Sequence, residues 1–355
     1  MTLDALFSPI TLGALELPNR IVMAPMTRSR ATDDDLVTDL HVDYYRQRAS
    51  AGLIISEGVH PSLDGKGYNR TPGLFLPEHA EAWSKVTAAV KAQGGQMVAQ
   101  LMHCGRVGHP DNKAPGARFL APSAIACKDQ IFTPNGMQSM PEPEAMTLEE
   151  IKEVQAQYVN SALLAIQAGF AGVELHCTSG YLPAQFLSTG TNQREDNYGG
   201  SLVNRLRFVL ETVAAIAVAV GHDRVGIRIC PANPFNDLHD DDPKETFAAL
   251  MQGLNDYNLA YLHVIRMNAT GLDSLALARE NFKGLVIAND SYSAEEANQA
   301  IADGLVDAVS FGRPFIANPD LPARFQAGAE LARIDMKTLY GGEAEGFTDY
   351  PPMSA

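Results

Sequence analysis

A histidine, a serine and a tyrosine lie close together at the end of an apolar run. His176 ends this run at residues 172–177, and Ser179 and Tyr181 follow it. A single histidine in such a run is more often a buried structural residue, but the three groups together indicate chemistry. His176 and Ser179 can donate hydrogen bonds to one substrate oxygen, while Tyr181 delivers a proton nearby. We therefore predict a substrate-activating edge here.

A glycine and an arginine follow another apolar run, at residues 308–311. Gly312 lets the backbone approach an anion closely, and Arg313 offers it a forked cation. Phosphate sites in barrel enzymes frequently use the loops after the seventh and eighth strands. The pattern predicts a phosphate site; the alternative is that Arg313 is only a surface residue after a strand.

Two further polar residues stand inside apolar runs of strand length. Arg228 lies in the run 225–230, and Gln100 lies in the run 96–103. A charge in an apolar strand is costly unless it is paired or liganded. Arg228 is thus either part of an ion pair with a neighbouring strand or, with Gln100, a contact for the polar edge of a planar cofactor.

Short apolar runs alternate along the whole chain with segments of helical period. The expected strands are 20–26, 53–59, 96–103, 172–177, 225–230, 261–267, 285–289 and 308–312. The expected helices are 39–51, 78–94, 147–169, 201–221, 243–257, 273–282, 293–303 and 319–329. This alternation predicts an α/β fold, a single (β/α)8 TIM barrel with its site at the C-terminal strand ends.

A doubly wound open sheet is the competing architecture. Such a sheet usually carries a glycine-rich dinucleotide fingerprint after its first strand. Pro25, Met26, Thr27 and Arg28 stand at that point here, and they cannot form that turn. The closed barrel is therefore favoured.

Two segments fall outside the alternation. Residues 6–17, with a turn at Gly13, suit an N-terminal hairpin that closes the bottom of the barrel. Residues 104–146 follow the third strand, are rich in Pro, Gly and Ala, and suggest a long loop insertion that acts as a lid. Since no linker stands out, we expect residues 1–355 to form one domain.

The net charge of −15 disfavours nucleic acid or an anionic membrane as a partner. No apolar run reaches the ~20 residues of a membrane helix. The N-terminus lacks the pattern of a secretory signal, so we expect a cytoplasmic protein. The spacing of the four cysteines suits neither zinc nor a redox pair, and no metal site is expected.

Long motifs distributed over nearly the whole chain carry a family resemblance. The chain resembles the Old Yellow Enzyme family of FMN-dependent ene-reductases. The matching stretches are residues 17–30 (LPNRIVMAPMTRSR), 44–57 (YYRQRASAGLIISE), 180–187 (GYLPAQFL), 192–201, 204–208, 311–321 (FGRPFIANPDL) and 348–351 (TDYP).

The resemblance implies non-covalent FMN lying across the strand ends. Thr27 would hydrogen-bond the flavin C4 carbonyl, Arg228 would stabilise the charge of reduced flavin, and Asp290 and Ser291 would help at the phosphate through their backbone. The implied cofactor contacts are Pro25, Met26, Thr27, Gly58, Gln100, Arg228, Asp290, Ser291, Gly312 and Arg313.

The resemblance also implies a reaction in two halves. NADPH or NADH gives a hydride to the flavin and leaves, and an alkene conjugated to a carbonyl or nitro group then binds in the same place. His176 and Ser179 would polarise the oxygen and Tyr181 would protonate the α carbon. Tyr68 and Met102 would complete the substrate pocket.

Three positions depart from the family pattern. Ser179 stands where Asn or His is usual, so the oxygen is held by a shorter side chain. Met102 stands where Trp is frequent, which predicts a roomier pocket. Asp290 replaces a common Gly near the phosphate, where a carboxylate side chain must turn away.

Other functions remain open at this level. The same site would suit reduction of nitrate esters or nitroaromatics, or a non-catalytic flavin carrier. A flavin-free barrel aldolase or isomerase would need a strand-end lysine or acid, and Glu57 and Asp290 are the candidate acids. The sequence leaves open the natural substrate, the choice of NADH or NADPH, the stereochemistry, and whether the protein is a monomer or a homo-oligomer.

Overall fold

Eight parallel strands close into a barrel in the computed structural model, which describes residues 2–353. Spatial order follows chain order, and the last strand pairs with the first. The strands are β3 (Ile21–Met23), β4 (Leu53–Val59), β5 (Met97–Leu101), β10 (Gly172–Cys177), β11 (Val225–Ile229), β12 (Tyr261–Ile265), β13 (Val286–Asn289) and β14 (Ala308–Phe311). The predicted closed barrel is confirmed. Of the predicted domain, Met1, Ser354 and Ala355 lie outside the described residues.

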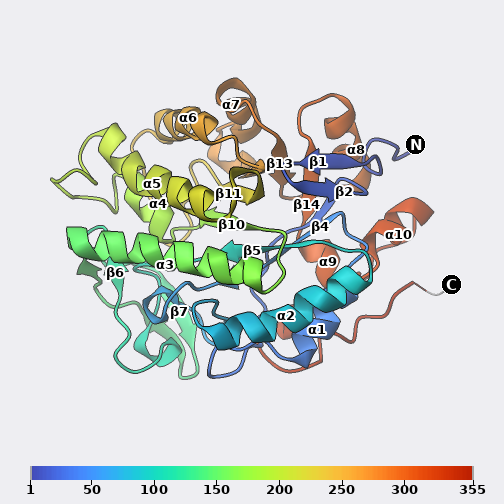
Figure 1. Ribbon diagram of the computed structural model, residues 1–355, viewed down its shortest axis with the longest axis horizontal. Coiled ribbons are helices and arrows are strands. Elements are labelled where there is room, and N and C mark those ends of the chain that lie inside the picture. The colour runs from blue at the N-terminus through green and yellow to red at the C-terminus, as the bar shows by residue number, and fades with distance from the viewer. Residues whose placement is uncertain (1, 354–355) are drawn as a thin grey trace.

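Helices surround the strands (Figure 1). The predicted ones are α1 (Asp39–Arg46), α2 (Pro77–Ala92), α3 (Leu148–Gln167), α5 (Leu202–Val220), α6 (Pro243–Leu254), α7 (Ser274–Asn281), α8 (Ala294–Ala302) and α10 (Leu321–Ala327). Short 3-10 turns lie at Leu63–Gly65, Pro110–Asn112, His222–Arg224, Asn255–Tyr257, Asn268–Thr270 and Met336–Thr338. Thr147 and Ser293 cap α3 and α8 by accepting from backbone N–H groups.

Two short helices were not predicted. α4 (Leu182–Leu187) follows Tyr181 directly, and α9 (Arg313–Ala317) follows Gly312 directly. Neither is long enough to show a helical period, although each has a proline in its first turn. Both begin where a strand-end loop carries a predicted site residue.

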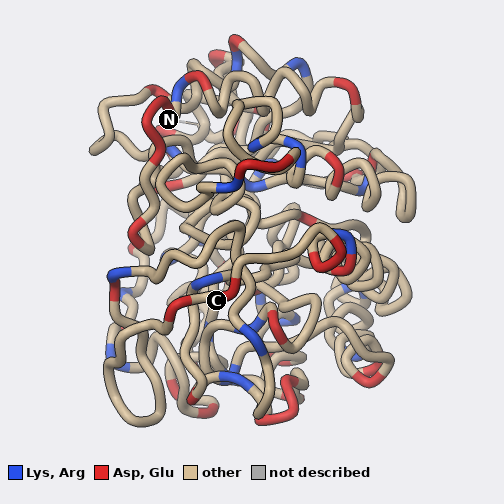
Figure 2. The backbone as a smooth tube through the Cα atoms, turned by 90° about the vertical axis from the view of Figure 1, so that its left-hand side faces the viewer, with Lys and Arg blue, Asp and Glu red and all other residues tan. Residues whose placement is uncertain are grey.

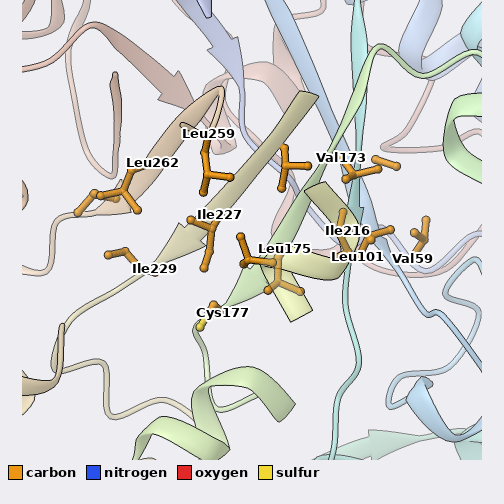
Figure 3. Packing of buried hydrophobic residues seen from close by; sticks show 14 of the residues in the cluster. Val59, Leu101, Val173, Leu175, Cys177, Ile216, Ile227, Ile229, Leu259 and Leu262 are labelled. Atoms are coloured by element: carbon orange, nitrogen blue, oxygen red, sulfur yellow. The ribbon is translucent and has the colours of Figure 1, made fainter. Parts of the chain in front are cut away.

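The strands alternate between the helix layer and the barrel interior. The outward residues of β10 are Val173, Leu175 and Cys177, which pack in one cluster with Ile216 of α5 (Figure 3). Glu174 and His176 therefore point the other way, into the barrel. In β11, Ile227 and Ile229 join the same outer cluster, and Arg228 faces inward. Alternation thus delivers the polar residues of these strands to the interior.

The strand β4 breaks this alternation. Its pairing with β5 shifts register between Ile55 and Gly58, as at a β-bulge. Glu57 consequently turns toward α1, where the Tyr45 hydroxyl lies 3.4 Å from its Oε1, and burial raises the pKa of Glu57 to about 7. The expectation that Glu57 stands at the strand-end site is wrong for this reason.

A hairpin closes the bottom of the barrel, as predicted. Its strands β1 (Ile10–Leu12) and β2 (Leu15–Leu17) are antiparallel. The leucines Leu12, Leu15 and Leu17 are buried in a cluster with interior residues such as Val98. The turn needs a glycine, since Gly13 has φ +58° and a Cβ there would lie 2.2 Å from the Asp223 carbonyl oxygen.

The insertion 104–146 folds over the opposite end. It contains β6 (Leu120–Ala121), β7 (Gln130–Thr133), β8 (Gly136–Ser139) and β9 (Glu144–Ala145). Val107, Cys127 and Ile131 pack in one cluster with Met102 and Tyr181. The insertion therefore covers the strand ends beside two predicted substrate-pocket residues.

Acidic and basic residues are interspersed over the face drawn in Figure 2. Within residues 2–353, no helix combines the length and the apolar character that crossing a membrane requires.

The hairpin's contribution to stability can be measured by truncating one of its leucines. We expect Leu15→Ala to lower the free energy of unfolding by about 2–5 kcal/mol, because it leaves a cavity in the interior cluster. The neighbouring Glu16 side chain is exposed, so Glu16→Ala should change it by less than about 0.5 kcal/mol. Chemical denaturation of both variants compares them; equal effects would show that the hairpin does not seal the barrel.

Candidate active site

A cavity of about 450 Å³ lies at the C-terminal ends of the barrel strands. Barrel enzymes carry their sites at this end. The predicted site residues that line it are Pro25, Met26, Thr27, Gln100, Met102, His176, Ser179, Tyr181, Arg228, Asp290, Ser291, Gly312 and Arg313. The fold therefore brings nearly all of them together, from segments almost 290 positions apart in the chain.

Two predicted residues do not line this cavity. Gly58 lies behind Met102, and a Cβ at Gly58 would stand 2.6 Å from the Met102 sulfur. Gly58 is thus a position that makes room for Met102, and its expected backbone contact with a cofactor ring stays a prediction. The Tyr68 hydroxyl lies 3.1 Å from that of Tyr181, so Tyr68 adjoins the cavity through Tyr181.

A layer of polar side chains forms the cavity floor. Strand register places Gln100 beside Glu174, Arg228 beside His263, and Asn289 beside Ser310. The Gln100 Nε2 donates to Glu174 Oε1 at 2.8 Å, and the Asn289 Nδ2 donates to the Ser310 carbonyl at 2.9 Å. Each of these polar groups is therefore anchored by its neighbour on the next strand.

Arg228 is buried within this layer but keeps its charge unpaired. Its Nη1 approaches the His263 Nε2 at 2.9 Å, and its Nη2 donates to Asn289 Oδ1 at 2.7 Å. No carboxylate of residues 2–353 forms a direct ion pair with it. Burial lowers the pKa of Arg228, while Glu174 raises it. Of the two predicted alternatives, the structure excludes a direct ion pair and leaves a cation lining the cavity.

Sequence reasoning missed Glu174 and His263. Both are fully buried and are joined by a 2.8 Å contact between Glu174 Oε2 and His263 Nδ1. The available signal was a polar residue at an inward position of an otherwise apolar strand, the same signal that identified Arg228. In the sequence, Glu174 and His263 each stand alone as a polar residue in an apolar strand, and only the strand register of the barrel places them side by side.

The segment His176–Tyr181 lies along one wall of the cavity, as predicted. The His176 and Tyr181 rings are 5.1 Å apart between centroids. The His176 ring lines the cavity, and its Nδ1 is enclosed by protein without a hydrogen-bond partner. Burial, followed by the charge of Arg228, lowers the pKa of His176 to about 3, so the ring is neutral at pH 7.

Tyr181 is a protonated phenol at neutral pH. Burial raises its pKa well above the ordinary value, and the neighbouring Tyr68 adds to that shift. The wall therefore presents a neutral imidazole and a phenolic proton side by side. This arrangement can hold a substrate oxygen and supply a proton to a nearby carbon.

Ser179 stands in a tight turn between these two residues. Its φ is +58°, and Gly180 follows with φ +73°. The Ser179 carbonyl accepts from Asn236 Nδ2 at 2.8 Å, and a Cβ at Gly180 would lie 2.7 Å from the Asn236 Cβ. The loop after β11 thus fixes the turn. A positive φ is uncommon for serine and more frequent for asparagine.

The opposite end of the cavity is cationic and has an open backbone. Arg313 is exposed and has no ion pair with any other residue of the described chain. A Cβ at Gly312 would meet only ordinary van der Waals contacts, with the Met26 sulfur at 3.5 Å and the Ala24 Cβ at 4.0 Å. Asp290 and Ser291 line this end with φ values of +89° and +56°. The Asp290 carboxylate accepts from the Ser291 hydroxyl at 3.1 Å, so part of it is engaged locally.

The C-terminal segment supplies two lining residues that were not predicted, Leu339 and Tyr340. Two buried arginines hold this segment through its backbone carbonyls. Arg28 Nη2 donates to Gly346 at 2.6 Å, and Arg30 Nη2 donates to Glu345 at 2.8 Å. Nothing local in the sequence connects residues that are more than 300 positions apart.

The donor set fits FMN. The floor offers an amide and a guanidinium to a polar heterocycle, Thr27 adds a hydroxyl, and the far end offers Arg313 and Gly312 to a phosphate. His176 and Tyr181 line the wall of the same cavity and offer an imidazole and a phenol to a substrate oxygen. In the described part of the chain, no group of His, Cys, Asp or Glu is arranged to hold a metal ion.

Comparison with known proteins agrees with this geometry. A probable flavin mononucleotide-dependent alkene reductase of Leishmania infantum is 41% identical over 361 aligned positions, covering 99% of this chain and 98% of the relative. A solved structure of morphinone reductase in complex with tetrahydroNAD is 43% identical with a TM-score of 0.94, covering 98% of each chain. An old yellow enzyme homologue of Zymomonas mobilis is 37% identical with a TM-score of 0.94, covering 98% of this chain and 99% of that one. Residues 5–332 match the NADH:flavin oxidoreductase / NADH oxidase family, and the chain belongs to that family.

Proposed function

We propose that this protein is an FMN-dependent ene-reductase that takes its electrons from NADH or NADPH. The observation that carries the proposal is the cavity wall, where the neutral His176 stands beside the protonated Tyr181. A flavin carrier has no need of a buried phenolic proton next to its cofactor. Of the two acids that a flavin-free aldolase or isomerase could use, Glu57 points away from the cavity, and Asp290 lines the end that carries Arg313 and is engaged by the Ser291 hydroxyl. The cytoplasmic location stays a prediction.

The floor and the far end of the cavity would hold FMN. Gln100 and Arg228 suit its pyrimidine edge, Thr27 suits a ring carbonyl, and Gly312 with Arg313 suits the phosphate. Pro25 and Met26 would contact it through backbone atoms, and Asp290 and Ser291 would do so at the phosphate. When bound, FMN accepts a hydride from the nicotinamide and passes it to the substrate.

The wall residues act on the substrate itself. A neutral His176 donates a hydrogen bond to the carbonyl or nitro oxygen without adding a charge, and Ser179 adds a second donor. Together they draw electron density from the double bond and orient it over the floor. Tyr181 then gives its proton to the α carbon, while Tyr68 holds the phenol in place through their shared hydrogen bond.

The substrate class follows from these donors. They fit one oxygen conjugated to a double bond, which describes α,β-unsaturated carbonyls and nitroalkenes. Relatives named as an alkene reductase, 12-oxophytodienoate reductases and morphinone reductase support this class. Nitrate esters and nitroaromatics present similar oxygens to the same wall, and they form the second candidate class.

The role of Tyr181 can be tested by following the two half-reactions separately. Wild-type protein should be yellow, bleach anaerobically with NADH or NADPH, and recolour when a cyclic enone is added. Tyr181→Phe should slow the recolouring by about 10²- to 10⁴-fold, because the general acid is gone. It should leave the bleaching rate nearly unchanged, because hydride transfer to FMN needs no proton from this wall.

Stopped-flow absorbance of wild type and variant gives both rates. Equal slowing of the two halves would contradict the proton-donor role of Tyr181. A wild-type protein that takes up no FMN would exclude the whole function. Bleaching that neither enones nor nitroalkenes reverse would favour a carrier.

The role of Ser179 can be tested by exchanging its donor. Asparagine tolerates the positive φ better and reaches further, so Ser179→Asn should lower KM for a cyclic enone by about two- to tenfold, as expected for one added hydrogen bond. Ser179→Ala lacks the donor and should raise KM by a similar factor. Steady-state kinetics compares the three proteins; identical KM values would show that residue 179 does not touch the oxygen.

A further inference from the structure

The proposed reaction does not explain why the two opposite charges of the polar floor, on Arg228 and Glu174, are kept apart. Arg228 contacts only neutral acceptors, His263 and Asn289, although the Glu174 carboxylate lies in the same buried layer. A direct ion pair would be the usual way to bury a guanidinium. Here the His263 side chain stands between the two groups, and the Glu174 carboxylate contacts His263 at 2.8 Å.

The contacts of His263 determine where its proton lies. Its Nδ1 faces Glu174, and a carboxylate can only accept, so Nδ1 carries the hydrogen. Its Nε2 lies 2.7 Å from the Ser310 hydroxyl and 2.9 Å from Arg228 Nη1. Arg228 Nη1 is also 3.2 Å from Nδ1, so it lies over the face of the ring, and the Ser310 hydroxyl donates to Nε2. Burial, followed by the charge of Arg228, lowers the pKa of His263 to about 4, which keeps the ring neutral.

Glu174 is the ionised member of the layer. Burial raises its pKa, but His263, Arg228 and Gln100 outweigh burial and leave the pKa below the ordinary value. Its two oxygens accept from Gln100 and His263 at 2.8 Å each. One carboxylate thus orients two of the floor residues that line the cavity, Gln100 directly and Arg228 through the imidazole.

We propose that Glu174 and His263 are positioning residues that orient Arg228 toward the cavity and limit how strongly its charge favours reduced flavin over oxidised flavin. This rests on the proposed function, because it assumes that FMN occupies the floor. A carboxylate in direct contact would occupy the guanidinium hydrogens and neutralise its field. A carboxylate behind an imidazole balances the buried charge and leaves the remaining guanidinium hydrogens free for the cofactor.

The sign of the effect follows from charge. Glu174→Gln keeps the side-chain shape and removes a negative charge, so the floor becomes more positive. Reduced flavin carries a negative charge beside Arg228, so its binding should be strengthened relative to that of the oxidised form. We expect the ratio of the dissociation constants, oxidised over reduced, to rise about tenfold, which corresponds to about 30 mV for a two-electron couple.

The matched control is a second buried carboxylate that points away from the cavity. Glu57 is fully buried on β4 and faces α1, so Glu57→Gln should change the ratio by less than about twofold by comparison. The measurement is made at pH 8, where wild-type Glu57, with its pKa of about 7, is mostly ionised. Holoprotein potentials from dye equilibration and dissociation constants for oxidised FMN give the ratio for wild type and both variants.

A rise in the ratio for Glu174→Gln with none for Glu57→Gln supports the proposal. An unchanged or lowered ratio for Glu174→Gln, or an equal rise in both variants, overturns it. Should Glu174→Gln fail to fold, the ¹⁵N spectrum of His263 in wild-type protein decides. A neutral ring protonated at Nδ1 supports the arrangement, and an imidazolium or a ring protonated at Nε2 overturns it. That spectrum needs no FMN, so it separates this inference from a failure of FMN binding, which would exclude the proposed function.

Discussion

The main constraint on the site is that the Arg228 guanidinium must stay charged inside the barrel. Removing such a group from water costs several kcal/mol unless its hydrogens find acceptors. Arg228 finds them on two neighbouring strands, in the imidazole of His263 and the amide of Asn289. Those acceptors stand at the right height only because parallel strands in a closed barrel share one register. The closed barrel therefore makes the cationic floor possible.

Tight turns at the strand ends complete the site. Residues with positive φ follow β10 and β13, at Ser179 and at Asp290 and Ser291. A positive φ is costly for residues other than glycine, and residues in this conformation are found most often at functional sites. At Ser179 the loop after β11 fixes the turn through Asn236, so the donor beside His176 is held by a contact from another strand. The strand register of the barrel sets the position of each polar group along the barrel axis. The turns set the direction in which the side chains of the strand-end loops point.

Much of this could be predicted from the sequence, for identifiable reasons. The strands are near-continuous apolar runs because helices cover the barrel, so their number and order were readable. Arg228 and Gln100 stood out as polar residues inside such runs. Glu57 was placed wrongly because one bulge in β4 reverses the alternation, and no local pattern announces that bulge. Leu339 and Tyr340 were missed because only tertiary contacts from Arg28 and Arg30 bring the C-terminal segment to the cavity.

The pair Glu174 and His263 shows the same limit. Each residue was visible as a polar exception in its strand, but their relation to Arg228 exists only in the register of three adjacent strands. Chemistry that depends on one residue in its loop, such as the Tyr181 proton, is therefore easier to predict than chemistry spread across a sheet. Two of the three positions that depart from the family pattern, Ser179 and Asp290, have positive φ, where the conformational preference of the residue matters most.

The central claim is that one cavity holds the flavin ring on its cationic floor and the phosphate at Gly312 and Arg313. Equilibrium titration of apoprotein with FMN and, in parallel, with riboflavin tests it most directly. The account predicts one FMN per chain and riboflavin binding weaker by at least about tenfold, because riboflavin lacks the phosphate and its charge-assisted hydrogen bonds. Equal affinity for the two flavins, or binding of neither, would contradict it.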